Sequence, residues 1–322
     1  MLLLPIAIPA RMHIPDGFLS GAVSIALWAL AILIVGYALR RVGKDLDERK
    51  VPMMGVLAAC IFAGQMLNFT VAGGTSGHLM GAAIATILLG PWASIVVLTC
   101  VVSVQALIFQ DGGLLALGGN IFNMAVVGTA VSFMAYRTIR RIAGDRAWGI
   151  LGGGFTAGWL SIVVAALGVA LQLAASGSSR ANIAVPAMGG VHALIGIGEG
   201  LITAGALAFV YASRRDLLIA GGARPVGGRA VWLGGLIVAL ALAAASPLAS
   251  ANPDGLEWVA QQQGFFNRAQ APSYQIIPDY ALPGVSDAAL ATILAGIVGV
   301  LIVLGVALAI AYARRNRRSA EG

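Results

Sequence analysis

The chain has 322 residues, of which 59% are apolar and 10% are charged, and its mean hydropathy is +0.90. A soluble domain carries about 25% charged residues. The composition therefore excludes a soluble protein over most of the length and predicts an all-α polytopic membrane protein in a lipid bilayer. The net charge of +7 comes from bases in short gaps between apolar segments, which is typical of cytoplasmic loops, so no nucleic-acid partner is expected.

Nine apolar segments are candidates for membrane-spanning helices, because a crossing needs about 20 apolar residues. In chain order they are 20–40, 52–70, 78–90, 92–109, 117–136, 148–174, 188–212, 230–250 and 288–312. The third segment is short and is separated from the fourth by Gly90-Pro91. We expect these two segments to form either a tight hairpin or a broken helix that lines an internal site.

A change in composition divides the chain into two units. We expect a seven-helix body over residues 12–212, a cytoplasmic linker rich in Gly and Arg over 213–229, and a two-helix appendage over 230–322. The appendage contains a loop of 37 residues, 251–287, on the outer side. Loops of this length are usually functional or disordered, and a docking role is the favoured alternative.

The positions of Lys and Arg predict the orientation, because these residues are enriched in cytoplasmic loops. Seventeen of the twenty bases fall on one side of the nine expected crossings, and Arg11, Arg180 and Arg268 fall on the other. This bias places the N-terminus outside and the C-terminus in the cytoplasm.

Three histidines are the strongest candidates for chemistry. His13 precedes the first predicted helix, His78 ends a glycine-rich segment, and His192 opens the seventh helix. The predicted topology brings all three to the outer side, where imidazoles without a nearby Cys favour nickel or cobalt over a soft ion. The alternative is that main-chain groups at helix ends satisfy each imidazole, and topology alone gives the two interpretations equal weight.

The segment that begins at Met12 predicts a planar chelate. If Met12 is the first residue, its amine, the His13 amide nitrogen and the His13 imidazole form five- and six-membered rings around one ion, and His78 completes the square. Square-planar nitrogen coordination selects Ni(II) or Cu(II). Residues 1–11 would convert that amine into an amide. They lack the basic start and long apolar stretch of a signal peptide, so we interpret them as an extension from a misassigned start codon.

Other polar residues are expected around the ligands. Asp16 and Glu199 are candidates to orient imidazoles or attract a cation, because carboxylates at membrane depth usually have a function. His192 and Glu199 are two helical turns apart, so both face one cavity. The candidate hydrogen-bond partners of the ligands are Asn68, Thr75 and Ser76. Loop formation in a glycine-rich turn is the equal alternative for these three residues.

Three motifs stand at these positions: Met12–Leu19 reads MHIPDGFL, Gly74–Leu79 reads GTSGHL, and His192–Glu199 reads HALIGIGE. Together they resemble the substrate-capture subunit of nickel and cobalt energy-coupling-factor transporters, the NikM/CbiM family, over residues 12–215. The motif NPDGLE at 252–257 resembles the companion N component of these transporters, here fused to the same chain.

The resemblance implies a metal-capture domain of the S-component type whose ligands are Met12, His13 and His78. It also implies two partners in the membrane of a prokaryotic cell, a cytoplasmic ABC-type ATPase and a transmembrane coupling (T) subunit. The ion is the transported substrate, Ni²⁺ or Co²⁺, and no resident cofactor is expected. The planar nitrogen site and the fused N component favour nickel.

The sequence contains no Gly-x-x-x-x-Gly-Lys-Ser/Thr phosphate loop, so we expect a transport subunit and not an enzyme. The alternative is a stand-alone secondary carrier or channel for divalent metal ions. Such a carrier usually shows paired repeats and a series of ionisable groups through the membrane. Below the outer rim this chain offers Glu199 and little else.

Overall fold

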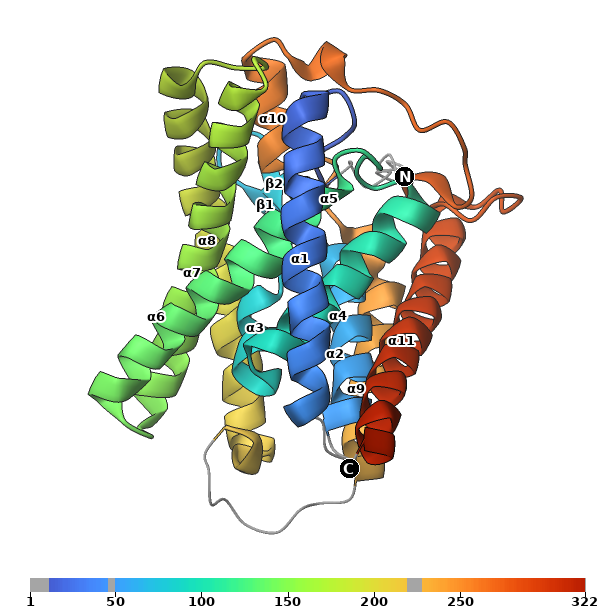
Figure 1. The fold of residues 1–322 in the computed structure, drawn as a ribbon. Coiled ribbons are helices and arrows are strands. Elements are labelled where there is room, and N and C mark those ends of the chain that lie inside the picture. The colour runs from blue at the N-terminus through green and yellow to red at the C-terminus, as the bar shows by residue number, and fades with distance from the viewer. Residues whose placement is uncertain (1–11, 46–49, 219–227, 322) are drawn as a thin grey trace, which may run out of the picture.

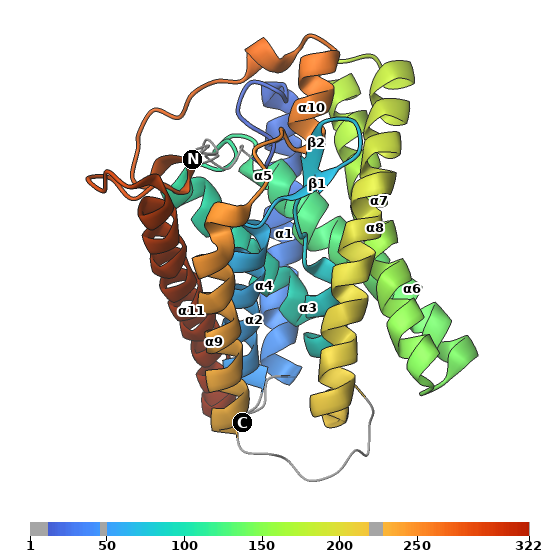
Figure 2. The same cartoon turned by 180° about the vertical axis from the view of Figure 1, so that it is seen from behind.

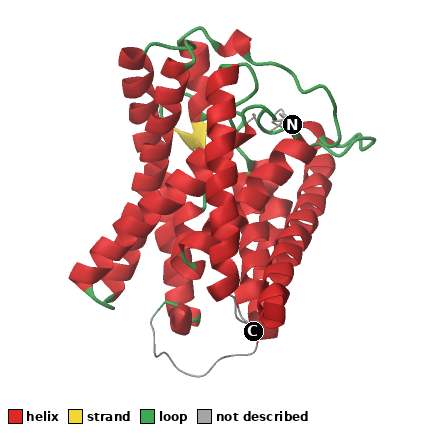
Figure 3. Ribbon diagram, viewed as in Figure 1, coloured by secondary structure: helices red, strands yellow, loops and turns green. Residues whose placement is uncertain are grey.

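The computed structural model describes residues 12–45, 50–218 and 228–321. In these ranges the chain forms an almost entirely helical bundle with one small sheet at one end (Figure 3). The predicted all-α membrane fold is confirmed. The predicted extension 1–11 and the central part of the predicted linker, 219–227, lie outside the described residues.

Eleven α-helices and two strands make up the described bundle. The helices are α1 (Gly21–Asp45), α2 (Lys50–Gln65), α3 (Ala82–Leu89), α4 (Pro91–Val104), α5 (Leu117–Asn120), α6 (Gly128–Ala143), α7 (Ala147–Ala175), α8 (Ala181–Ser213), α9 (Gly228–Ala245), α10 (Gly255–Gln262) and α11 (Ala288–Glu321). The strands are β1 (Phe69–Val71) and β2 (Thr75–Gly77).

Six helical segments in the described part of the chain are long and apolar enough to cross a membrane: Gly21–Gly43, Pro91–Phe109, Leu117–Ala143, Ala147–Ala175, Ala181–Ser213 and Ala288–Asn316. Two shorter apolar helices accompany them, Lys50–Gln65 and Trp232–Leu248. This set does not confirm the predicted division into seven helices plus two.

The third predicted span contains only a short helix. α3 has 8 residues and is therefore about 12 Å long, less than half the thickness of the hydrocarbon core. Gly90, with φ +86°, ends α3, and Pro91 begins α4. The hydroxyl of Thr86 donates to that of Ser94 at 3.1 Å, which ties the two helices together. Of the two predicted alternatives, the structure shows a short helix and a longer one joined by a tight turn.

Helix α4 continues into a π-helical turn, Gln105–Phe109. A π-helical turn leaves main-chain groups outside the regular hydrogen-bond pattern, and such turns often occur at functional sites. Here the C-terminal part of the chain binds two of the carbonyls. The Tyr274 hydroxyl donates to the oxygen of Leu107 at 2.9 Å, and the Ile277 amide donates to that of Ile108 at 2.9 Å.

The C-terminal helices pack on the body and do not stand apart from it. Both α9 and α11 contact α2, while α7 and α8 pack against each other on the other side of the bundle (Figure 2). Non-helical segments gather at the end where α1 begins. There β1 and β2 pair antiparallel, with Thr70 opposite Ser76, and α10 lies beside them (Figure 1). The predicted loop 251–287 contains α10 and two short 3₁₀ turns.

Candidate metal centre

The segment before α1 is buried at this end of the bundle. Met12 and His13 are 3% and 4% exposed. The Ile14 amide donates to the side-chain oxygen of Asn120 at 3.0 Å, and the Asn120 amide group donates back to the Ile14 oxygen at 3.1 Å. This reciprocal pair fixes the backbone directly after His13.

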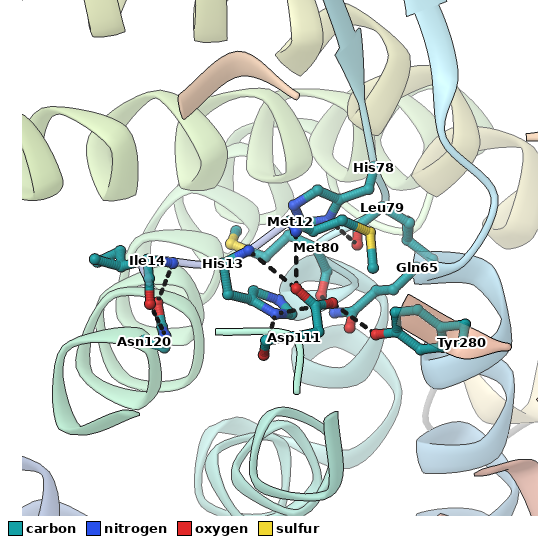
Figure 4. Close-up of polar contacts among 10 residues, drawn as sticks. All are labelled: Met12, His13, Ile14, Gln65, His78, Leu79, Met80, Asp111, Asn120 and Tyr280. Carbon is teal, nitrogen blue, oxygen red and sulfur yellow. Dashed lines mark hydrogen bonds and ion pairs between the residues drawn. The ribbon is translucent and has the colours of Figure 1, made fainter. Parts of the chain in front are cut away.

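Asp111 gathers the nitrogens of this segment (Figure 4). The Met12 main-chain nitrogen lies 2.8 Å from Asp111 Oδ1, and the His13 main-chain nitrogen lies 3.3 Å from the same oxygen. His13 Nδ1 lies 3.3 Å from Asp111 Oδ2. The three nitrogens that the predicted chelate requires therefore face one carboxylate and converge on one small region.

Two glycines make this approach feasible. Gly112 has φ +94°, a conformation that L side chains rarely adopt, and a Cβ at this position would contact the Cβ of His13 at 2.9 Å. A Cβ at Gly113 would overlap the main-chain nitrogen of Asp16. The sequence Asp111-Gly112-Gly113 thus brings a carboxylate against the main chain without steric conflict.

His78 comes from the hairpin formed by β1 and β2, directly after the second strand. Its ring lies at a centroid distance of 5.6 Å from the His13 ring, at an interplanar angle of 74°. Glu199 on α8 holds the segment that follows, because its carboxylate accepts from the amides of Met80 at 2.7 Å and Gly81 at 3.0 Å. Glu199 is fully buried, so its carboxylate needs donors from the protein, and these two amides provide them.

The tautomers of two histidines follow from their contacts. His78 Nδ1 lies 3.1 Å from the oxygen of Leu79, and His192 Nδ1 lies 2.8 Å from that of Met188. A carbonyl oxygen only accepts, so each Nδ1 carries the hydrogen and each Nε2 keeps its lone pair. Such an Nε2 is suited to bind a metal ion.

The three histidines line one cavity of about 80 Å³. The structure thus brings His13, His78 and His192 together at one cavity. Met12 and Asp254 also contribute to the wall, whereas Glu199 is not among the lining residues and acts from behind it.

The site separates the pKa values of its groups. Burial acts to lower the pKa of His13, but the charge and hydrogen bonds of Asp111 outweigh this effect and raise it above 6.5. Burial, together with the charge of His13, lowers the pKa of His78 to about 4. For Asp111, burial opposes ionisation, yet His13 and the donated hydrogen bonds lower its pKa to about 2. Burial raises the pKa of Asp254 to about 8. At neutral pH the site therefore holds an ionised Asp111 and an unprotonated His78.

Side chains alone do not make a metal site in the described ranges, because they contain no group of three His, Cys, Asp or Glu residues placed to hold an ion. The main-chain nitrogens of Met12 and His13 lie together beside these side chains and are candidates for further ligands.

Three of the predicted surrounding residues, Asp16, Thr75 and Ser76, contact other parts of the chain. The carboxylate of Asp16 accepts from the amides of Leu114 and Ala116, and so fixes the loop after Asp111. The hydroxyls of Thr75 and Ser76 donate to the oxygens of Pro253 and Asn252 at 3.1 and 2.8 Å. These two hydroxyls thus bind the C-terminal unit.

Asn68 is buried, and its main-chain oxygen accepts from the Ser250 amide at 2.8 Å. Its side-chain amide bonds to none of the described groups. The main-chain contact of Asn68 therefore also joins the β-hairpin region to the C-terminal unit.

Sequence reasoning did not select Asp111 or Asn120 for this site and gave no role to Tyr280 or Asp254. The Tyr280 hydroxyl donates to Asp111 Oδ2 at 2.6 Å. Asp254 pairs with Ser76 in an isolated β-bridge and caps α10 by accepting from the Glu257 amide. One signal for Asp111 was present in the sequence: a lone carboxylate followed by two glycines between apolar segments.

Two family models match the chain. The model described as the cobalt uptake substrate-specific transmembrane region matches residues 13–217, and that of the PDGLE domain matches residues 229–316. The boundary between them falls within the predicted linker.

Curated relatives extend over nearly the whole chain. A protein of Archaeoglobus fulgidus described as a putative fused nickel transport protein NikMN is 38% identical over 307 residues, which cover 94% of this chain and 99% of the relative. The fused nickel transport protein NikMN of Rhodobacter capsulatus is 31% identical and covers 96% of this chain and 100% of the relative. A crystal structure titled as a truncated transition metal transporter is 33% identical, with a TM-score of 0.56 over 63% of this chain and 99% of that one.

Proposed function

The chain belongs to the CbiM family of substrate-specific transmembrane proteins for cobalt uptake, in the fused form that also carries a PDGLE domain, and we propose that it captures a divalent transition metal ion for an energy-coupling-factor transporter. Relatives that cover nearly the whole chain are described as nickel transport proteins, and a relative that covers 64% of the chain is described as a cobalt transport protein. The ion is the transported substrate and not a resident cofactor.

The observation that carries this proposal is the convergence of nitrogens at the start of the described chain. The main-chain nitrogens of Met12 and His13 and the His13 Nδ1 all face Asp111, and the His78 ring stands beside them. Four nitrogen ligands, two of them from the main chain, would bind an ion in a plane. His192 and Glu199 are support residues in this scheme, the first in the cavity wall and the second behind His78.

The Met12 nitrogen binds a metal strongly only as a free amine. We therefore propose that the functional chain begins at Met12 and that residues 1–11 are not retained. The burial of Met12 and the position of its nitrogen beside Asp111 support this proposal. Mass spectrometry of the N-terminal peptide from purified protein tests it, and a mature protein that begins at Met1 would contradict it.

The site end of the bundle faces outward in the proposed topology, and the C-terminus lies in the cytoplasm of a prokaryotic cell. The support is the distribution of bases, seventeen of which fall on the opposite side. Because the sequence contains no phosphate loop of its own, energy would come from a cytoplasmic ABC-type ATPase through a transmembrane coupling subunit. Cysteine labelling from each side of the membrane tests the orientation.

Nickel is the preferred substrate in this proposal. A planar set of four nitrogens suits Ni(II) better than Co(II). Competition between the two ions for the purified protein tests this preference, and equal or tighter binding of Co²⁺ would contradict it.

The function is tested by uptake of radioactive Ni²⁺ into proteoliposomes that contain the full chain with and without its ATPase and coupling partners. We expect uptake that requires ATP and both partners, and its loss in His78→Ala. Uptake by the chain alone, driven by an ion gradient, would favour the alternative of a secondary carrier. In detergent, His78→Ala should lower the Ni²⁺ affinity at least a hundredfold while the variant stays folded.

A further inference from the structure

Tyr280 lies at the centre of the contact between the PDGLE domain and the proposed metal site. The residue is 1% exposed, and its ring stacks on that of Phe109 with a centroid distance of 4.8 Å and an interplanar angle of 16°. Its hydroxyl donates to Asp111 Oδ2 at 2.6 Å. Aromatic packing therefore fixes the ring, and the ring directs one hydroxyl at one carboxylate oxygen.

The two oxygens of Asp111 have different partners. Oδ2 accepts from Tyr280 and lies near His13 Nδ1, whereas Oδ1 faces the main-chain nitrogens of Met12 and His13. A carboxylate rotates about its last side-chain bond unless both oxygens are held. The Tyr280 hydroxyl thus sets the rotation that directs Oδ1 at the two main-chain nitrogens.

Backbone strain is concentrated on both sides of this bond. In the described ranges the non-glycine residues with positive φ are Gln110 at +55°, Asp279 at +52° and Tyr280 at +55°. Gln110 directly precedes Asp111. Strained residues persist where their surroundings over-determine them, and they cluster at functional sites. Each of these three residues is therefore either a partner in the Tyr280–Asp111 hydrogen bond or next to one in the chain.

The segment 274–280, which contains Tyr280, is also held in place by bonds that do not involve the Tyr280 hydroxyl. The Ile276 amide donates to the side-chain oxygen of Gln110 at 3.2 Å, and the Ile277 amide donates to the oxygen of Ile108 at 2.9 Å. Tyr274 adds its bond to Leu107. A variant that loses only the Tyr280 hydroxyl should therefore keep the segment docked.

We propose that Tyr280 is a positioning residue of the metal site, which acts through Asp111 to hold the Met12–His13 segment in the shape that binds the ion. The PDGLE domain thereby becomes part of the site without supplying a ligand. This inference rests on the proposed function, since it presumes that Met12, His13 and His78 bind Ni²⁺.

The test is Tyr280→Phe in the full chain, which keeps the stacked ring and removes one oxygen atom. Isothermal titration with NiCl₂ gives the affinity, and the visible absorption band of planar Ni(II) reports the geometry. We expect an affinity about tenfold lower than that of the wild type and a weaker or shifted band, because the two main-chain nitrogens are no longer held together. Thermal melting of the metal-free variant checks that it is folded.

Tyr274→Phe is the matched control. It removes a hydroxyl from the same segment, but that hydroxyl donates to a carbonyl of the π-helical turn and not to Asp111. Its Ni²⁺ affinity and absorption band should equal those of the wild type. Equal losses in Tyr274→Phe and Tyr280→Phe would mean that docking alone matters, and would overturn the proposal.

A double-mutant cycle with Asp111→Ala, which removes both acceptor oxygens, tests whether Tyr280 acts through Asp111. In the Asp111→Ala background, Tyr280→Phe should have no further effect on affinity. A full, additive loss there would overturn the proposal, as would a wild-type affinity and band in Tyr280→Phe alone. A wild-type protein that binds no Ni²⁺ would instead overturn the proposed function, and the inference with it.

Discussion

The body and the PDGLE domain contribute different things to the same cavity. Residues of the body supply the nitrogens that we propose as ligands, from Met12, His13 and His78. The PDGLE domain supplies contacts to the groups that hold those nitrogens, through Tyr280 on Asp111 and through Pro253 and its neighbours on the hairpin. In the proposed site the body therefore supplies the ligands and the residues that hold them, while the PDGLE domain supports those residues, so substitutions in the two parts should have different consequences.

Among the residues that hold the proposed ligands, the largest effect is expected within the body, for Asp111→Ala. This change removes the acceptor shared by three nitrogens and the negative charge beside the cation, so the Ni²⁺ affinity should fall about a hundredfold, or ~2.7 kcal/mol. Titration calorimetry measures the change. Asp16→Asn is the control, because this carboxylate binds loop amides and not the ligand nitrogens. Equal losses for both would show that loop stability, and not Asp111, sets the affinity.

The pH dependence should follow His13 and not His78. The pKa of His13 is raised above 6.5 because Asp111 outweighs burial, whereas that of His78 is lowered to about 4 by burial and by His13. An ion must displace the proton of His13, and that of the Met12 amine as well, so the Ni²⁺ affinity should rise as the pH is raised from 6 to 7.5. Titrations at several pH values test this, and a flat profile over that window would contradict it.

A tenfold effect is expected for Glu199→Gln, which acts on placement from within the body. The Gln side chain keeps one acceptor oxygen, but its NH₂ group then faces one of the two main-chain N–H groups of Met80 and Gly81. Two donors cannot form a hydrogen bond, so the segment after His78 is held less firmly. We expect about tenfold weaker Ni²⁺ binding with a lowered melting temperature. Asp287→Asn, at the start of α11, alters a comparable carboxylate–amide bond away from the site. If the control weakens binding as much, a general loss of stability explains both.

The smallest effect is expected where the two units meet on the hairpin. Ser76→Ala removes the hydroxyl bond to Asn252 but leaves the main-chain bond from the Ser76 amide to Pro253. The cost should be about 1 kcal/mol of stability with less than a threefold change in Ni²⁺ affinity. Thermal melting and calorimetry on the same sample separate the two. A loss of binding larger than that of Glu199→Gln would show that the hairpin contact is part of the site.

Features that depend on local sequence were predictable, and features that depend on long-range contacts were not. Apolar length identified the long spans, because the apolar composition of a segment is a local property. For the third span the sequence left a tight hairpin and a broken helix open, because a short apolar segment before Gly90-Pro91 does not show where its helix begins; α3 has only 8 residues. For His192 the sequence predicted that the side chain faces a cavity, but it did not identify the hydrogen-bond partner of the ring.

The support of the site was not predictable, because its partners lie far apart in the chain. Asp111 is 99 residues from Met12, and Tyr280 is 169 residues from Asp111. No periodicity or spacing joins such positions. By contrast, the proposed Met12–His13 chelate is contained in two adjacent residues, which is why it could be proposed from the sequence alone.

The proposed metal site depends most on the Met12 nitrogen as a ligand. The most direct measurement compares the Ni²⁺ affinity of a protein that begins at Met12 with that of the same protein carrying one added glycine before Met12. The added residue changes the amine to an amide and leaves every side chain in place. We expect the added glycine to lower the Ni²⁺ affinity at least a hundredfold and to abolish the planar Ni(II) absorption band. Equal affinity and an unchanged band in both proteins would contradict the proposed site.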